Sequence, residues 1–169
     1  REALDIADAP TVVRYPKGSV PPPLPAIAHC GAMDILARRG SDASVVVLGI
    51  GPMAATAVDV ADVLASQGES VVAATATWVH PVPEGLADVI ADAEVVVTIE
   101  DGLADAGVGH EWAAWAREAG IRARWSHHGV PRRFIQHSTR AEILADAGLD
   151  APSIAAHVIQ DRAAAGKQD

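Results

Sequence analysis

From residue 32 onward, short apolar runs alternate with segments whose apolar residues recur at helical spacing. The runs are rich in valine and alanine, which is typical of strands covered on both faces of a sheet. The pattern predicts strands at 33–38, 44–50, 70–75, 93–99 and 122–126, and helices at 52–67, 84–91, 109–119, 139–147 and 151–164. Strands that alternate with helices indicate right-handed parallel crossovers. The predicted fold is a three-layer α/β/α sandwich with a mostly parallel sheet of about five strands, in which 33–38 is an antiparallel edge strand.

Residues 1–31 follow a different pattern. Residues 2–6 have a helical pattern with no capping residue before it, and Thr11–Tyr15 predicts a short strand. The proline-rich stretch that follows favours an extended conformation. We interpret 1–20 as an arm, 21–31 as a linker and 32–169 as the main domain, although a surface loop of one domain explains the prolines equally well. Because the chain starts at Arg1 inside this pattern, we expect it to be part of a longer protein.

Composition narrows the possible partners and cell compartment. The chain has 169 residues, of which 13 are lysine or arginine and 22 are aspartate or glutamate. This acidic balance argues against a nucleic-acid partner, which would require clustered basic residues. No apolar run approaches the ~20 residues that cross a bilayer, so we expect no membrane partner. A single cysteine excludes a disulfide framework and indicates the reducing cytoplasm.

Residues 49–54 match the G-x-G-x-x-A dinucleotide-binding pattern between a predicted strand and a predicted helix. A helix N-terminus there would offer free backbone N–H groups to an anion. The pattern also requires an acidic residue at the end of the next strand, where this chain has Thr75-Ala76-Thr77. Two interpretations remain: a nucleotide- or anion-binding module, or a glycine turn that lets strand and helix approach closely.

Three side chains are candidates for a site at the carboxyl edge of the sheet, where open α/β proteins bind ligands. Glu100 and Asp101 end the strand at 93–99, and His80 follows the strand at 70–75. The adjacent carboxylates could orient a neighbour, bind a metal or receive a base, and an ordinary turn explains them as well. His80 is a candidate for an interface or entrance residue. The alternative is a structural histidine that the two nearby prolines hold in place.

The other histidines do not form a metal-binding pattern. His127 and His128 are adjacent in a predicted strand end, so their side chains point to opposite faces of the sheet. No H-x-x-x-H pair, nucleophile elbow, Walker loop or Cys-His motif occurs. We therefore predict no metal site, and the motifs alone reveal no catalytic centre.

Six short motifs nevertheless occur in a characteristic order. They are VRYPKG (13–18), GIGPM (49–53), WVHPVP (78–83), VTIEDG (97–102), GVG (107–109) and GVPRRF (129–134). The series, with the ending at 138–149, resembles the C-terminal part of the 1-deoxy-D-xylulose-5-phosphate synthase family over essentially the whole chain. Transketolases and the β subunits of pyruvate dehydrogenase share the general scheme, so the order and spacing of the motifs carry the resemblance.

The resemblance implies a thiamine-diphosphate and Mg²⁺ dependent transferase that condenses pyruvate with D-glyceraldehyde 3-phosphate to 1-deoxy-D-xylulose 5-phosphate and CO₂. That reaction feeds isoprenoid and thiamine biosynthesis. It also implies that residues 1–20 are the tail of the pyrimidine-binding middle domain, and that 32–169 are a transketolase C-terminal-like domain. Lys17 stands where the family usually has an arginine that contacts anionic substrate groups, so it is a candidate substrate-binding residue or a solvated lysine. The loop 103–106 departs from the family pattern, which leaves its contacts open.

In that family the N-terminal and middle domains hold the cofactor, so we expect neither thiamine diphosphate nor Mg²⁺ to bind this chain, and no catalytic residue within it. The expected role is structural, with those domains as partners and support of a homodimer, and the chain alone is expected to be inactive. The alternatives are a separately encoded subunit of a thiamine-diphosphate enzyme and the independent anion-binding module.

Overall fold

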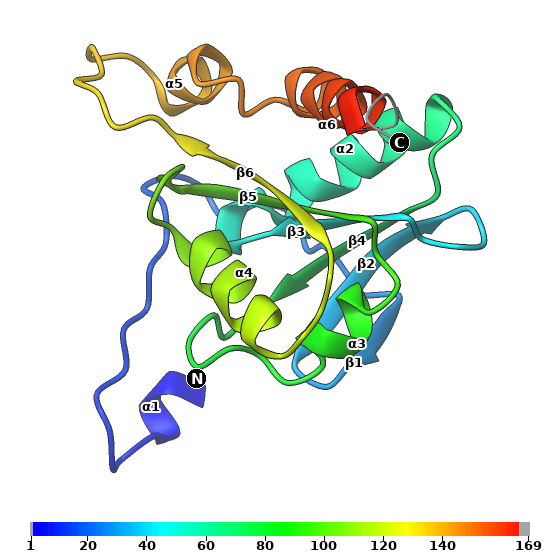
Figure 1. Cartoon of the computed structure of the whole chain (residues 1–169). Coiled ribbons are helices and arrows are strands. Elements are labelled where there is room, and N and C mark those ends of the chain that lie inside the picture. Colours follow the sequence, from blue (N-terminus) through cyan, green and yellow to red (C-terminus); the bar gives the residue numbers. More distant parts are fainter. Residues whose placement is uncertain (1, 166–169) are drawn as a thin grey trace.

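The computed structural model describes residues 2–165, which form a six-stranded sheet with helices on both faces (Figure 1). The strands are β1 (Ala28–Cys30), β2 (Met33–Arg39), β3 (Val45–Gly49), β4 (Val71–Ala76), β5 (Val95–Leu103) and β6 (Arg124–Val130). The helices are α1 (Glu2–Asp5), the 3₁₀ turn η1 (Gly51–Met53), α2 (Ala54–Ser66), α3 (Leu86–Ile90), α4 (Val108–Glu118), α5 (Arg140–Asp146) and α6 (Ala151–Ala165). The predicted α/β fold is confirmed.

The strand order is β1-β2-β4-β3-β5-β6, and the sheet is mostly parallel. Strands β4, β3, β5 and β6 are parallel to one another, and β2 is antiparallel to both of its neighbours. The predicted number of five strands was one too low, because β1 pairs with the outer side of β2. Strand β2 is antiparallel, as predicted. It is not the edge strand, because β1 lies on its outer side.

Successive side chains of each buried strand point to opposite faces of the sheet, so the core has two layers. Val45 and Val47 pack on the face covered by α2 and α6, whereas Val46 and Leu48 pack on the face covered by α3 and α4. Each layer buries aliphatic side chains almost completely, and Trp112 of α4 is the largest fully buried side chain in its layer. This arrangement is the three-layer sandwich that the sequence predicts, and it explains why β3 reads as a continuous apolar run.

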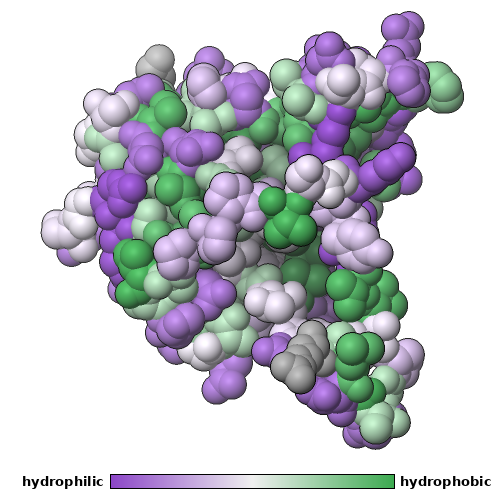
Figure 2. All heavy atoms as spheres, turned by 180° about the vertical axis from the view of Figure 1, so that it is seen from behind, coloured by the Kyte–Doolittle hydropathy of each residue, from purple (hydrophilic) through white to green (hydrophobic). Residues whose placement is uncertain are grey.

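The N-terminal arm lies outside this core. Helix α1 is present, but the strand predicted at Thr11–Tyr15 is wrong, because this stretch has no regular secondary structure and pairs with no strand of the sheet. From behind, apolar residues recur along the arm at the lower right (Figure 2). The exposed large apolar side chains of the arm and the linker are Leu4, Ile6, Val12, Val13, Tyr15, Val20, Leu24 and Ile27.

The other predicted elements are present with shifted bounds. Strands β5 and β6 extend four residues further than their apolar patterns, because their backbones remain paired up to Leu103 and Val130. Helix α5 begins after Thr139, whose hydroxyl accepts a hydrogen bond from the backbone N–H of Glu142 in a capping box. Among residues 2–165, no helix is both long and apolar enough to cross a bilayer.

Candidate functional site

Strands β3, β4, β5 and β6 all end at the carboxyl edge of the sheet, where the sequence places its candidate residues. Glu100 and Asp101 lie in the last part of β5, after the register shift that follows Ile99. His80 lies in the segment that leaves β4. The structure therefore places the three candidates at one edge, and each has a different partner.

Glu100 caps helix α4. Its carboxylate is buried, with 6% of the residue exposed, and accepts hydrogen bonds from the backbone N–H groups of Val108 and Gly109, both at 3.1 Å. These N–H groups belong to the first turn, which has no partner inside the helix, and the positive end of the helix dipole favours a carboxylate there. Gly107 leaves room for this arrangement, because a Cβ at this position would clash with both carboxylate oxygens. The position of Glu100 is thus fixed by the fold.

Asp101 pairs with a residue that the sequence analysis did not select. Arg140, at the start of α5, donates a hydrogen bond to Asp101 at 2.9 Å. A second pair of this kind lies nearby, where the Arg132 guanidinium donates two hydrogen bonds to Asp105, at 3.0 and 3.2 Å, and lowers the pKa of that carboxyl. Both arginines are far from their partners in sequence, so no local spacing could have revealed the pairs.

His80 lies against helix α4. Its Nδ1 is 2.6 Å from Oε1 of Glu111, and both side chains are well exposed. The preceding residue, Val79, accepts a hydrogen bond from the indole N–H of the buried Trp112 at 3.1 Å. These two contacts fasten the loop after β4 to α4, which favours a positioning role for the loop.

Lys17 is exposed on the arm. Arg14, three residues earlier, instead lines an open hollow of about 560 Å³ together with Glu100, Asp101 and Glu111. In the sequence, Arg14 stands out only as part of the VRYPKG motif. Each of these three carboxylates already has a partner, in the N–H groups of α4, in Arg140 and in His80 respectively.

The turn at 49–54 serves packing. A Cβ on Gly49 would lie 2.7 Å from Cα of Ala54 and 2.9 Å from its nitrogen, so glycine allows the strand to approach the helix. Gly51 has a φ of +59° with no atom near its missing Cβ. The structure thus supports the structural interpretation of this motif.

Two further histidine pairs were missed as pairs. The His127 ring stacks on His110 of α4, with centroids 4.0 Å apart, and its Nδ1 is 2.8 Å from the Thr98 hydroxyl. His128 faces the other layer, where it stacks on His157 of α6 with centroids 5.9 Å apart. The opposite orientation of His127 and His128 is as predicted. Burial, followed by the positive charge of the neighbouring histidines, lowers the pKa of each to about 4.

These pKa values predict a specific loss of stability in acid. The unfolded histidines titrate near pH 6.5, so below that value the unfolded chain binds more protons than the folded one, and stability falls until the pH reaches about 4. Allowing for solvent screening of these partly exposed rings, we expect a loss of about 2 kcal/mol between pH 6.5 and 4.5. Urea unfolding at both pH values measures it.

The variant His128→Gln provides the control for this prediction. It removes one titrating ring, so its stability should change by about half as much across the same interval. If stability depends on pH equally in the variant and the original chain, the loss does not come from His128 and the prediction is wrong. Hydrogen bonds from Ser138 and Thr139 lower the pKa of Glu142 to about 2, so its unfolded carboxyl begins to take up protons only at the lower end of the interval, near pH 4.5, and it does so equally in the variant and the original chain.

Within residues 2–165, no three side chains of histidine, cysteine, aspartate or glutamate are grouped closely enough to hold a metal ion. Residues 33–154 match the model of the transketolase C-terminal domain. The chain belongs to the transketolase C-terminal domain family.

Curated proteins similar to this transketolase C-terminal domain include several synthases. It is 42% identical to 1-deoxy-D-xylulose-5-phosphate synthase 2 of Streptomyces avermitilis over 94% of this chain and 25% of the relative. It is 41% identical to the synthase of Thermobifida fusca over 92% of this chain and 25% of the relative. The predicted resemblance is confirmed, and the chain spans about a quarter of the length of these relatives.

Two solved structures share the fold of this transketolase C-terminal domain. A split-gene transketolase, described as an inactive β4 tetramer, has a TM-score of 0.66 at 22% identity, over 79% of this chain and 43% of that chain. The transketolase of Campylobacter jejuni has a TM-score of 0.55 at 10% identity, over 77% of this chain and 18% of that one. At these identities the likeness concerns the fold alone.

Proposed function

We propose that this chain is the C-terminal domain of a 1-deoxy-D-xylulose-5-phosphate synthase, called here the parent enzyme. The parent enzyme condenses pyruvate with D-glyceraldehyde 3-phosphate to 1-deoxy-D-xylulose 5-phosphate and CO₂, in the cytoplasm, and supplies isoprenoid and thiamine biosynthesis. The observation that supports this proposal is the 42% identity with a synthase over 94% of the chain.

The parent enzyme would use thiamine diphosphate and Mg²⁺, and the residues at the carboxyl edge do not fit these groups. The Glu100 carboxylate is buried on the first turn of α4, and Asp101 is paired with Arg140. A metal-bound diphosphate needs carboxylate or carbonyl oxygens that are free to coordinate Mg²⁺. We therefore propose that the N-terminal and middle domains of the parent enzyme hold both groups.

The role of this chain in the parent enzyme is architectural. The capped helix α4 and the loop fastened by Val79 and Trp112 make the carboxyl edge rigid enough to shape a substrate entrance beside the middle domain. Lys17 would offer an anionic substrate group a single-point contact, and His80 would line the entrance. Alone, the chain neither binds the cofactor nor turns over pyruvate, and in the parent enzyme it supports a homodimer.

A second possibility is that the chain is a separately encoded subunit of such an enzyme. The solved structure with a TM-score of 0.66 is described as a split-gene transketolase, so a transketolase can be divided between chains. Both forms of the proposal require the same partner domains.

The experiment replaces the matching quarter of the Streptomyces avermitilis synthase with this chain. We expect the chimera to form 1-deoxy-D-xylulose 5-phosphate, and the synthase truncated before that quarter to form none. Calorimetry should detect no binding of thiamine diphosphate and Mg²⁺ to the chain alone. An inactive chimera, or micromolar cofactor binding by the isolated chain, would contradict the proposal.

A further inference from the structure

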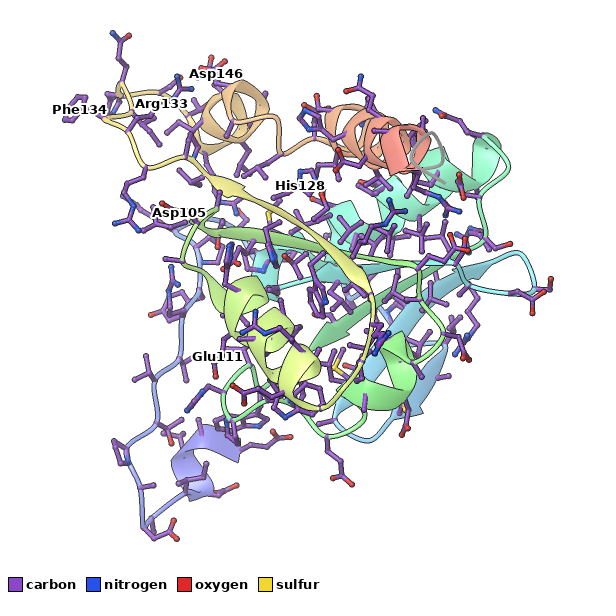
Figure 3. The ribbon with its side chains drawn as sticks, viewed as in Figure 1. Asp105, Glu111, His128, Arg133, Phe134 and Asp146 are labelled. Atoms are coloured by element: carbon purple, nitrogen blue, oxygen red, sulfur yellow. The ribbon has the colours of Figure 1, made fainter. Side chains whose placement is uncertain are left out.

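The loop between β6 and α5, residues 131–139, presents an aromatic side chain to solvent. Phe134 is 96% exposed, whereas Trp112, also aromatic, is completely buried. Figure 3 shows Phe134 and Arg133 at the tip of the loop, where both project away from the sheet and its covering helices. A single exposed apolar side chain is common on protein surfaces. The ring becomes a candidate contact through the ordered loop that carries it and the charge beside it.

The loop is held at both ends. Before Phe134, Arg132 donates two hydrogen bonds to Asp105 in the loop that follows β5. In the same loop, the backbone N–H of Ala104 donates to the carbonyl of Val130 at 3.0 Å. After it, the capping box of Thr139 fixes the start of α5. A loop that is already ordered loses less conformational entropy when it binds than a free one does, so Phe134 is suited to anchoring a contact.

Arg133 adds a charge beside the ring. Its side chain is exposed, and among residues 2–165 it makes no ion pair or side-chain hydrogen bond, in contrast to Arg132 and Arg140. Aromatic residues and arginine are enriched among the side chains that dominate binding energy at protein interfaces. The pair therefore fits a partner surface with an apolar pocket and a carboxylate next to it.

We propose that the loop 131–139 docks on the part of the parent enzyme that precedes this domain, with Phe134 in an apolar pocket and Arg133 paired with an acidic side chain. The inference rests on the proposed function. The length of the relatives supports this occupant, because three-quarters of their chain lies outside the region matched here and must meet this domain somewhere. A second copy of this chain is the competing occupant.

Trypsin tests the docking directly, because it cleaves after Arg133 when the loop is accessible. The cleavage rate is measured by mass spectrometry in the isolated chain and in the Streptomyces avermitilis chimera. We expect cleavage in the chimera to be at least tenfold slower. Phe134→Ala should abolish this protection, whereas Gln136→Ala, an exposed residue of the same loop, should retain it.

Equal cleavage rates in the chimera and the isolated chain would overturn the inference, and so would protection that survives Phe134→Ala. Protection of the isolated chain that increases with its concentration would assign the contact to a second copy and would also overturn it. Activity of the chimera is scored separately. An inactive but protected chimera would support docking while contradicting the proposed function, and an active but unprotected one would do the reverse.

Discussion

Replacing Gly49 with alanine is expected to lower the free energy of unfolding by about 3 kcal/mol. The new Cβ would lie 2.7 Å from Cα of Ala54, inside van der Waals contact with the backbone at the start of α2. A backbone cannot move aside as a flexible side chain can, and both flanking elements are buried in the core. The carbonyl of Gly49 also accepts a hydrogen bond from Thr75 at 2.6 Å, so a displaced strand end would disturb β4 as well. Urea unfolding measures the loss.

Gly51→Ala is the matched control in the same turn. Gly51 has a φ of +59°, and nothing lies within 4 Å of its missing Cβ, so the substitution costs only the strain of a left-handed alanine, about 1 kcal/mol. Similar losses at both positions would mean that steric contact at Gly49 is not the cause. A separate titration with NAD or ATP tests the anion-binding alternative. Protection of the Gly51 and Met53 amides on titration would favour a ligand role for the turn.

The sheet could be predicted from the sequence because its strands carry their own signal. Strand β3 is buried at every position, and its five residues therefore read as a continuous apolar run. The arm shows the limit of this reasoning. Val12, Val13 and Tyr15 have the composition of a strand, but a strand forms only where another strand offers its hydrogen-bonding edge. The opposite error occurs at β1, whose three residues carry too little pattern to be predicted and are ordered by pairing with β2.

For a related reason the edge of the sheet at which the candidate residues lie could be predicted, and their partners could not. The edge of the sheet follows from the order of strands and helices, which places Glu100, Asp101 and His80 together. Their partners depend on how loops return to that edge: Arg140 is 39 residues from Asp101, and Glu111 is 31 residues from His80. Such distances carry no periodic signal. A carboxylate in a sequence therefore reveals its position in the sheet more readily than whether its charge is already balanced.

Replacing Glu100 with alanine is expected to lower the free energy of unfolding by about 3 kcal/mol. Hydrogen bonds to a charged group contribute about 1.5–3 kcal/mol each, and the substitution removes the acceptor of the buried Gly109 N–H and of the part-buried Val108 N–H. Glu100→Gln keeps one acceptor oxygen and places an NH₂ group against a backbone donor, so about half of that loss is expected. Asp101→Asn, at the adjacent position, removes an exposed ion pair with Arg140 and should cost less than about 1 kcal/mol. Urea unfolding of the three variants gives the comparison.

The order of these three losses decides what the carboxylate at the end of β5 is for. A side chain kept for a ligand is often held at some cost to stability, so its removal leaves the fold unchanged or more stable. A helix cap behaves in the opposite way. If Glu100→Ala proves as stable as the original chain, the capping role is wrong and the carboxylate becomes available for chemistry. If the expected order holds, Glu100 stabilises the start of α4, and through α4 the positions of Glu111 and His80 at the proposed substrate entrance.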